Sequence, residues 1–387
     1  MSKLNDVVIN KLSGGLGRRT PEQDMVSGLL FSGVTTDELE ADKVVLLASL
    51  EDAGAYGITE SNDLGGQSVY YQIQQFFRMN PSGDLYIMKT AATSYENIAG
   101  KAKDMQEKAN GNIRQLAIIF AGETTTFAQT LAAVAAAQTQ AKFAYEDYMP
   151  FEVILEGKGF SSDDTTSLAG LGAENVSVVI AMDVEKSEKY PNSAAVGLAL
   201  GAISKAKVSE NIAWIEKFNL TGEGFAKAGF VGGEEVKTLG ILGDLNEKRY
   251  IFARTHTGLP GVYFNDSATC TTGTSDFAYV ENNRTINKAT RLLRTALLPK
   301  LASPVLVDID GKLPQSVSKS FEGLCRSALE GMIANQEVSA FDVYVDPKQN
   351  ILATSELKVK AEITPVGTAR KIMVDLGFKN PFGIDKA

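Results

Sequence analysis

Apolar residues along the chain recur with two different periods, and this pattern predicts strands that alternate with helices. Short apolar runs bounded by turn residues predict buried strands at residues 44–47, 85–88, 116–120, 151–155 and 175–181. Tyr70, Ile73 and Phe77 recur at helical spacing, and the alanine-rich segment 127–145 has a strong helical propensity. Strands separated by helices favour a sheet with parallel members and helices packed on its faces.

The later part of the chain has a different order of elements. We expect a strand at 249–254, helices at 285–298 and 318–336, and strands at 341–345 and 357–364. In the last of these, apolar residues from Leu357 to Ile363 alternate with polar ones, which is typical of a half-exposed strand. The pattern therefore predicts an α/β body built on a mixed sheet, followed by a C-terminal α+β domain.

Both ends of the chain have the pattern of short strands joined to the body through glycine or proline. Val7, Val8 and Ile9 precede the glycines at 14–17, and the period-two series Ile372, Val374 and Leu376 follows a hinge at 365–367. Terminal strands beyond such hinges pair with their own body or add to the sheet edge of a neighbour. Both alternatives stay open from this pattern alone.

These observations divide the chain into four parts. We expect an N-terminal arm at 1–20, a body at 21–265, a C-terminal domain at 266–364 and a C-terminal arm at 365–387. The fold class is therefore α/β and α+β, with extended N- and C-terminal strand arms. A length of 387 residues is ample for the two cores that this division requires.

Composition restricts the environment and the partners of the chain. With 44% apolar and 22% charged residues it has the composition of a soluble globular protein. No apolar run approaches the roughly 18 to 20 residues that span a bilayer, so we expect no membrane insertion and residence in a cytoplasm. Cys270 and Cys325 give no disulfide framework. A net charge of −9 argues against general affinity for nucleic acid.

One segment departs from this acidic balance. Five cations and no acid lie between Arg284 and Lys300. Arg284, Lys288 and Arg291 recur at i, i+4 and i+7, opposite the apolar face of the predicted helix. The pattern is that of a solvated helix face or of a surface for an acidic partner, and both interpretations stay open.

The chain offers few residues for catalysis or for a cofactor. Its single histidine, His256, is a candidate base for Ser267 or Ser275, but neither serine lies in a Gly-x-Ser-x-Gly elbow. The glycines at 14–17 lack the Lys-Ser/Thr end of a phosphate-binding loop, and one histidine with two distant cysteines does not supply a zinc site. We expect no catalytic residue, cofactor or metal, which favours binding or assembly.

Three stretches of the sequence resemble one known family. They are a loop, helix and turn-strand series at 50–57, 70–77 and 80–89, a proline and small-residue block at 190–199, and the segments 249–255 and 277–285. In this order and spacing the chain resembles the sheath protein of contractile phage tails and related contractile injection systems, in a short branch of unknown function. Two departures are Asn282-Asn283-Arg284, where many sheaths carry a paired arginine, and the acidic loop 161–167.

The resemblance implies a structural subunit rather than an enzyme. Such subunits stack as six-membered rings around an inner tail tube, exchange terminal strands and contract to drive the tube through a target envelope. The implied partners are further copies, the tube protein, and baseplate and terminator proteins, in a virion tail or injection particle assembled in the bacterial cytoplasm. The sequence leaves open whether that machine is a phage tail, an extracellular particle or a membrane-anchored apparatus.

Roles for individual residues follow from the same resemblance. The two arms, with Val7, Val8, Ile9, Ile372, Val374 and Leu376, are implied to be the exchanged strands. Candidate tube-facing residues are Arg284, Lys288 and Arg291 on one helix, and Lys319 and Arg326 on the next.

Two other functions remain as alternatives. The first is an α/β enzyme that binds a small ligand near His256 and Arg254. The second is another self-assembling virion protein, such as a tube, capsid or baseplate component.

Overall fold

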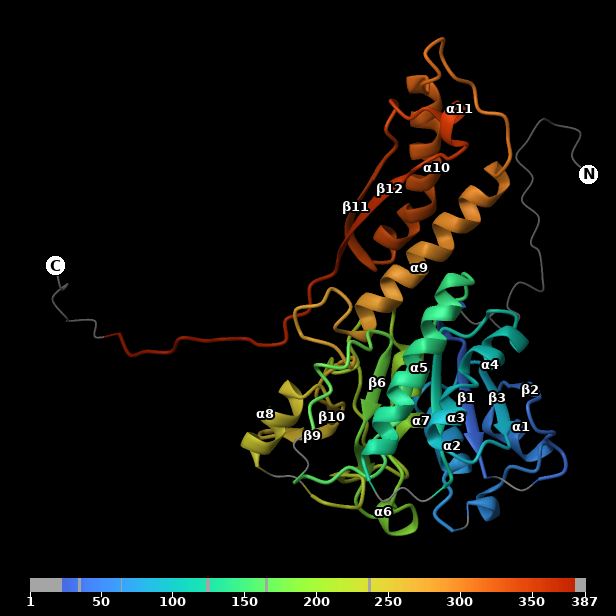
Figure 1. Cartoon of the computed structure of the whole chain (residues 1–387). Coiled ribbons are helices and arrows are strands. Elements are labelled where there is room, and N and C mark those ends of the chain that lie inside the picture. The colour runs from blue at the N-terminus through green and yellow to red at the C-terminus, as the bar shows by residue number, and fades with distance from the viewer. Residues whose placement is uncertain are drawn as a thin grey trace, which may run out of the picture.

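The computed structural model describes residues 23–379, apart from 34–35, 64, 123–125, 164–165 and 236–237. A large body forms the lower part of the molecule in Figure 1, and a smaller C-terminal domain projects above it on a long helix. The last described residues leave sideways from the region where these two parts meet (Figure 1).

A six-stranded mixed sheet is the centre of the body. Its strands are β1 (Ser27–Ser32), β2 (Val44–Leu47), β3 (Leu85–Thr90), β4 (Gln115–Ile119), β5 (Glu152–Glu156) and β6 (Val176–Val179). They lie in the order β2-β3-β1-β4-β5-β6, in which β2 is antiparallel to β3 and every other pair is parallel. The predicted α/β body with a mixed sheet is confirmed.

The position of two strands in this sheet differs from the expectation. The sequence pattern did not indicate β1, a central strand whose six residues are all buried, because Ser27 and Gly28 interrupt its apolar run. A Cβ on Gly28 would lie 2.7 Å from Leu116 Cδ1, so neighbouring side chains occupy that space. The prediction that 44–47 is a buried strand is wrong, because β2 is an edge strand on which Leu46 is exposed.

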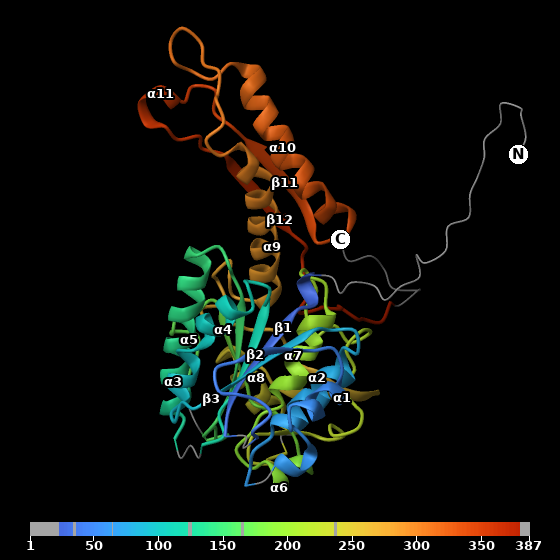
Figure 2. The same ribbon diagram turned by 90° about the vertical axis from the view of Figure 1, so that its right-hand side faces the viewer.

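Helices cover both faces of the sheet, as Figure 2 shows. One face is covered by α1 (Leu50–Ala55), α2 (Val69–Met79) and α7 (Val196–Lys205), and the other by α3 (Tyr95–Ala99), α4 (Ala102–Lys108) and α5 (Ala128–Glu146). Successive residues of a strand point to opposite faces, so Leu29 and Phe31 join the first apolar core and Leu30 joins the second. The body is therefore a three-layer unit.

Short elements complete the body below and beside the sheet. They are η1 (Gln23–Met25), η2 (Glu60–Asn62), β7 (Ala181–Asp183), α6 (Lys186–Lys189), β8 (Ala228–Phe230), α8 (Leu239–Glu247), β9 (Ala253–His256) and β10 (Leu259–Phe264). The strand predicted at 249–254 is only partly present, because Ile251 forms an isolated bridge to Val179 and β9 begins at Ala253. β9 and β10 form an antiparallel hairpin.

The C-terminal domain has an α+β arrangement with its own small core. Its elements are α9 (Val280–Leu297), η3 (Leu298–Lys300), α10 (Gln315–Ala334), β11 (Val338–Tyr344), α11 (Ile351–Thr354) and β12 (Lys360–Pro365). Cys325, Leu329 and Met332 of α10 pack with Val338 and Val343 of β11. Within the described ranges β11 pairs only with β12, and the pairing is antiparallel. Each of the two strands therefore has an open edge.

The described part of the C-terminal arm beyond Arg370 is extended and pairs with no described strand. Residues 371–379 are exposed and belong to no strand or helix. Its apolar residues lie in solvent, with Leu376 at 95% exposure and Ile372 and Val374 similarly open. Of the two alternatives predicted for this segment, pairing with its own body is absent from the described structure. Val7, Val8 and Ile9 of the other arm lie outside the described residues.

Candidate functional site

Asp24 of η1 and Arg370 both contact α9, and we call this meeting place the junction. It contains Asp24 of η1, Glu281, Arg284, Lys288 and Arg291 of α9, Glu337, and Arg370 at the start of the C-terminal arm. These residues lie on segments far apart in the sequence.

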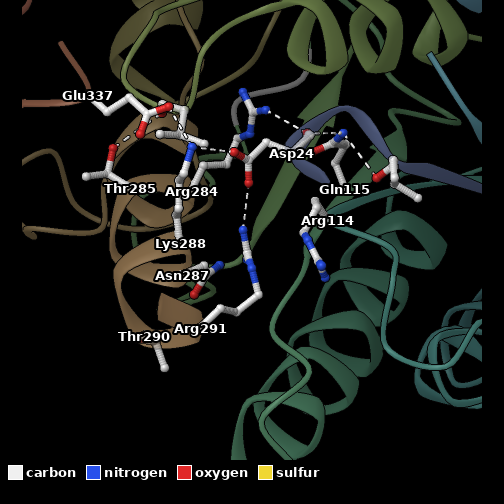
Figure 3. Close-up of polar contacts among 12 residues, drawn as sticks. Asp24, Arg114, Gln115, Arg284, Thr285, Asn287, Lys288, Thr290, Arg291 and Glu337 are labelled. Carbon is white, nitrogen blue, oxygen red and sulfur yellow. Dashed lines mark hydrogen bonds and ion pairs between the residues drawn. The ribbon is translucent and has the colours of Figure 1, made fainter. Parts of the chain in front are cut away.

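Asp24 is the centre of one half of the junction (Figure 3). Its two carboxylate oxygens pair with Lys288 Nζ at 2.6 Å and Arg291 Nη2 at 2.7 Å. Its backbone carbonyl accepts a hydrogen bond from Arg284 Nη2 at 3.1 Å. Lys288 also pairs with Glu337, at 2.6 Å between Nζ and Oε1. Asp24 is therefore held by three cations of α9, and Lys288 also connects it to Glu337, which lies between α10 and β11.

Burial disfavours the charged forms of these side chains, and the opposite charges of the cluster offset that effect for Asp24 and Lys288. Burial alone would raise the pKa of Asp24, but the cations Lys288, Arg291 and Arg284 outweigh it and lower that pKa. Burial alone would lower the pKa of Lys288, and Asp24 and Glu337 together raise it instead. Burial lowers the pKa of Arg284 to about 10, so this side chain stays protonated at neutral pH.

Of the two interpretations of Arg284, Lys288 and Arg291, the solvated helix face is wrong. Arg284 is 4% exposed and donates to the carbonyl oxygens of Ala206 and Lys207 at 3.2 and 3.3 Å. The helical period identifies a polar face, but it does not tell whether water or protein covers that face. Here η1, the loop 206–208 and Glu337 cover it, so the three cations are bound inside the chain.

The other two predicted cations lie on α10 and are more open. Lys319 has a side chain 62% exposed and pairs with Glu322 at 2.6 Å. Arg326 pairs with Asp342 of β11 and donates to the carbonyl of Val343 at 2.8 Å.

A buried carboxylate fixes α9 to the end of the sheet. Glu152 of β5 accepts hydrogen bonds from the Nδ2 atoms of Asn287 at 2.9 Å, Asn175 at 3.1 Å and Asn283 at 3.2 Å. Burial raises the pKa of Glu152 to about 7, although these amides act in the opposite direction. Sequence reasoning missed this contact. Its only local signals are an acid next to an apolar strand and two asparagines at i and i+4 on a helix, and neither signal indicates that the two segments meet.

Arg370 forms the other half of the junction. Its Nε lies 2.9 Å from Asp266 Oδ2, its Nη2 pairs with Glu281, and its guanidinium carbon lies 3.4 Å from the ring centre of Tyr279. Both acids are buried, and burial raises the pKa of Glu281 although Arg370 opposes that change. The C-terminal arm is therefore tied to the body at Arg370, and its free part begins at Lys371.

The candidate catalytic group of the alternative function is not assembled. Ser267 donates to Glu281 and Ser275 donates to Glu174, and neither donates to His256. Burial, followed by the charge of Arg254, lowers the pKa of His256. In the described part of the chain, no three His, Cys, Asp or Glu residues are grouped as metal ligands would be. No helix there is long and apolar enough to span a membrane.

Two family models account for most of the chain. DUF2586, N-terminal domain, matches residues 4–268, and DUF2586, C-terminal domain, matches residues 276–383. The chain belongs to the DUF2586 family. The gap between the two DUF2586 matches lies a few residues before α9. The comparison with curated proteins found no match.

Solved structures similar to this DUF2586 chain include contractile sheath and baseplate assemblies. The helical sheath of the anti-feeding prophage in its contracted state has 15% identity and a TM-score of 0.66, with 97% of this chain and 99% of that chain covered. The contracted PVC sheath complex of an extracellular contractile injection system has 11% identity, coverage of 97% and 98%, and a TM-score of 0.62. A sheath tail protein from Listeria innocua has 8% identity, coverage of 88% and 95%, and a TM-score of 0.53. The predicted resemblance is confirmed at the level of fold.

Proposed function

We propose that this chain is the sheath subunit of a contractile particle. It polymerises as stacked rings of six around an inner tube, exchanges terminal strands between copies and contracts to drive the tube through a target envelope. One observation carries the proposal: within the described residues, the apolar side chains of the C-terminal arm are exposed and pair with no strand, and the two-stranded sheet β11–β12 has two open edges. The sheath fold of the chain supports the same interpretation.

Strand addition explains why an exposed apolar arm and a sheet with open edges are present in one chain. An extended arm gains main-chain hydrogen bonds at an open sheet edge, and its alternate side chains gain burial. Burying Ile372, Val374 and Leu376 contributes about 1.5 to 3 kcal/mol each. Each ladder hydrogen bond adds about 0.5 to 1.5 kcal/mol. Ordering about eight residues costs roughly 1 to 2 kcal/mol per residue, so the balance is close to zero. One arm alone therefore binds weakly, and several contacts formed together hold the polymer.

The junction gives the arms a fixed attachment. Arg370 ties the root of one arm to Glu281 of α9, and Asp24 ties the root of the other to Lys288 and Arg291 of the same helix. We propose that force on either arm therefore acts on α9 and on the body beneath it. The extended sheath is then metastable, and rigid rotation of the bodies during contraction gains contacts between copies.

The remaining partners are proposed on the same basis. Lys319 and Arg326 of α10 are the tube-facing candidates, because Arg284, Lys288 and Arg291 are bound within the chain. Baseplate and terminator proteins are the partners at the sheath ends, and assembly takes place in the bacterial cytoplasm without nucleic acid, membrane insertion or catalysis. We keep the proposed division into arms at 1–20 and 365–387, a body at 21–265 and a domain at 266–364.

Electron microscopy of the purified chain tests the proposal. The full chain is expected to form hollow cylinders or stacked rings of six at high concentration. A chain ending at Arg370 keeps the junction and loses the free arm, so it is expected to stay monomeric with an unchanged thermal unfolding curve. A full chain that remains a single particle at every concentration would refute the sheath assignment.

A further inference from the structure

A cavity of about 1110 Å³ opens on the body beside the root of the C-terminal arm. Its walls come from the loop 207–215, α8 and the β9–β10 hairpin, and residues 366–370 form part of its rim. We call this cavity the groove. It borders the junction at Asp266 and Arg370, but the proposed strand exchange makes no use of its other walls.

The groove is lined by exposed apolar side chains and by an arginine whose Nε atom has no hydrogen-bond partner among the described residues. Trp214 is 47% exposed and Leu239 is 70% exposed, and both line the groove together with Ile215. The Nε atom of Arg254 is buried there and has no hydrogen-bond partner among the described residues. Buried donors are nearly always satisfied, and clustered exposed apolar residues mark interaction sites. A fitting partner therefore presents apolar side chains to Trp214, Ile215 and Leu239.

The position of the arm identifies that partner. Because Arg370 is held by Asp266, Glu281 and Tyr279, the arm starts at a fixed point on the rim of the groove. The eight residues 371–378 span about 26 Å when extended. The copy that accepts this arm is therefore tethered beside the groove that Trp214 and Leu239 line.

We infer that the groove is a docking surface for the body of the neighbouring copy that accepts the arm. The inference rests on the proposed sheath function and adds a second contact to it. The arm contributes a flexible tether, and the groove contributes a rigid contact that fixes how the two bodies lie against each other.

Trp214 is the only tryptophan of the chain, so its fluorescence reports on the groove directly. In the full chain, emission is expected to shift to shorter wavelength in the same concentration range in which cylinders form, because docking removes the indole from water. This measurement needs no substitution. Leu239→Lys is expected to raise the concentration needed for polymerisation about tenfold or more, since it removes an apolar anchor.

Ile241→Lys is the matched control for this substitution. Ile241 lies on the same helix, is 39% exposed and does not line the groove, so the variant is expected to polymerise like the unchanged chain. Thermal unfolding of both variants checks that the monomer is intact. If Leu239→Lys does not fold, Leu239→Ala replaces it.

The possible results separate the two proposals. Cylinders that form with unchanged Trp214 emission, or with equal ease for Leu239→Lys and Ile241→Lys, would overturn the groove inference and leave the sheath function standing. An emission shift that requires addition of a different protein would overturn the choice of a second copy. If the full chain never polymerises, the sheath proposal fails and the groove inference fails with it.

Discussion

Gly197 in α7 provides a quantitative test of how the body is packed. A Cβ built on Gly197 would lie 2.1 Å from the backbone oxygen of Gln72 in α2, and one built on Gly201 would lie 2.8 Å from the backbone oxygen of Phe76. Both obstacles are backbone atoms, which do not move aside as a flexible side chain does. Gly197→Ala therefore requires α2 and α7 to separate.

The cost of this substitution follows from the contacts that the separation breaks. Overpacking a core costs about 1 to 3 kcal/mol. The N–H of Gly197 donates to Gln72 Oε1 at 2.7 Å in a buried setting, and disrupting that bond adds about 1 to 3 kcal/mol. Alanine returns at most about 1 kcal/mol of helix propensity. We expect Gly197→Ala to lower the free energy of unfolding of the body by about 1 to 5 kcal/mol.

Chemical denaturation followed by circular dichroism measures this change. Gly243→Ala in α8 is the matched control, because Gly243 is a helical glycine of the same body and a Cβ there meets no atom within 4 Å. The control is expected to leave stability unchanged or raise it by up to about 1 kcal/mol. If Gly197→Ala is as stable as Gly243→Ala, the close approach of α2 and α7 is not present and the reasoning is wrong.

Three further predictions concern the charges around α9 and α10. Asp24→Asn leaves Lys288 and Arg291 without their carboxylate partner and is expected to cost about 3 to 5 kcal/mol, measured by denaturation; no loss would contradict the junction. The pKa of Glu152 rises from 4.5 to about 7 on folding, so the folded state binds more protons between these values and stability falls by about 3 kcal/mol as pH rises through them. Glu152→Gln should remove that part of the pH profile, and identical profiles would exclude the buried carboxylate as its source. Exchanging Lys319 and Arg326 for Glu is expected to leave unfolding nearly unchanged and to weaken tube-templated polymerisation in a co-assembly assay; unaltered assembly would remove α10 as the tube contact.

The structure also changes the meaning of one experiment on the basic residues. Reversing the charges of Arg284, Lys288 and Arg291 would test a tube contact if these residues lay on the surface. Because they hold Asp24 and the carbonyls of 206–207, we expect the triple variant to unfold instead. Loss of assembly in that variant therefore gives no information about the tube.

Local pattern was sufficient for much of the fold. The helices α2, α5 and α10 and the strands β3, β4 and β12 lie close to where their periods predict them. The alternation of apolar and polar residues in the C-terminal arm could also be read from the sequence, because it depends only on neighbouring residues. The central strand β1 was missed because its first residues, Ser27 and Gly28, are not hydrophobic. They are buried only because other elements surround them.

The sequence by itself determined most of the helices and strands, the exposed apolar pattern of the described C-terminal arm and the polar face of α9. Only the tertiary structure decided that this face meets protein rather than water, and that residues 24, 281–291, 337 and 370 form one junction. The reason is physical. Periodicity and propensity act within a turn or a strand, whereas the pairing of a charge depends on which distant segment packs against it. Asp24 and Arg291 are 267 positions apart in the chain, and no local pattern relates them.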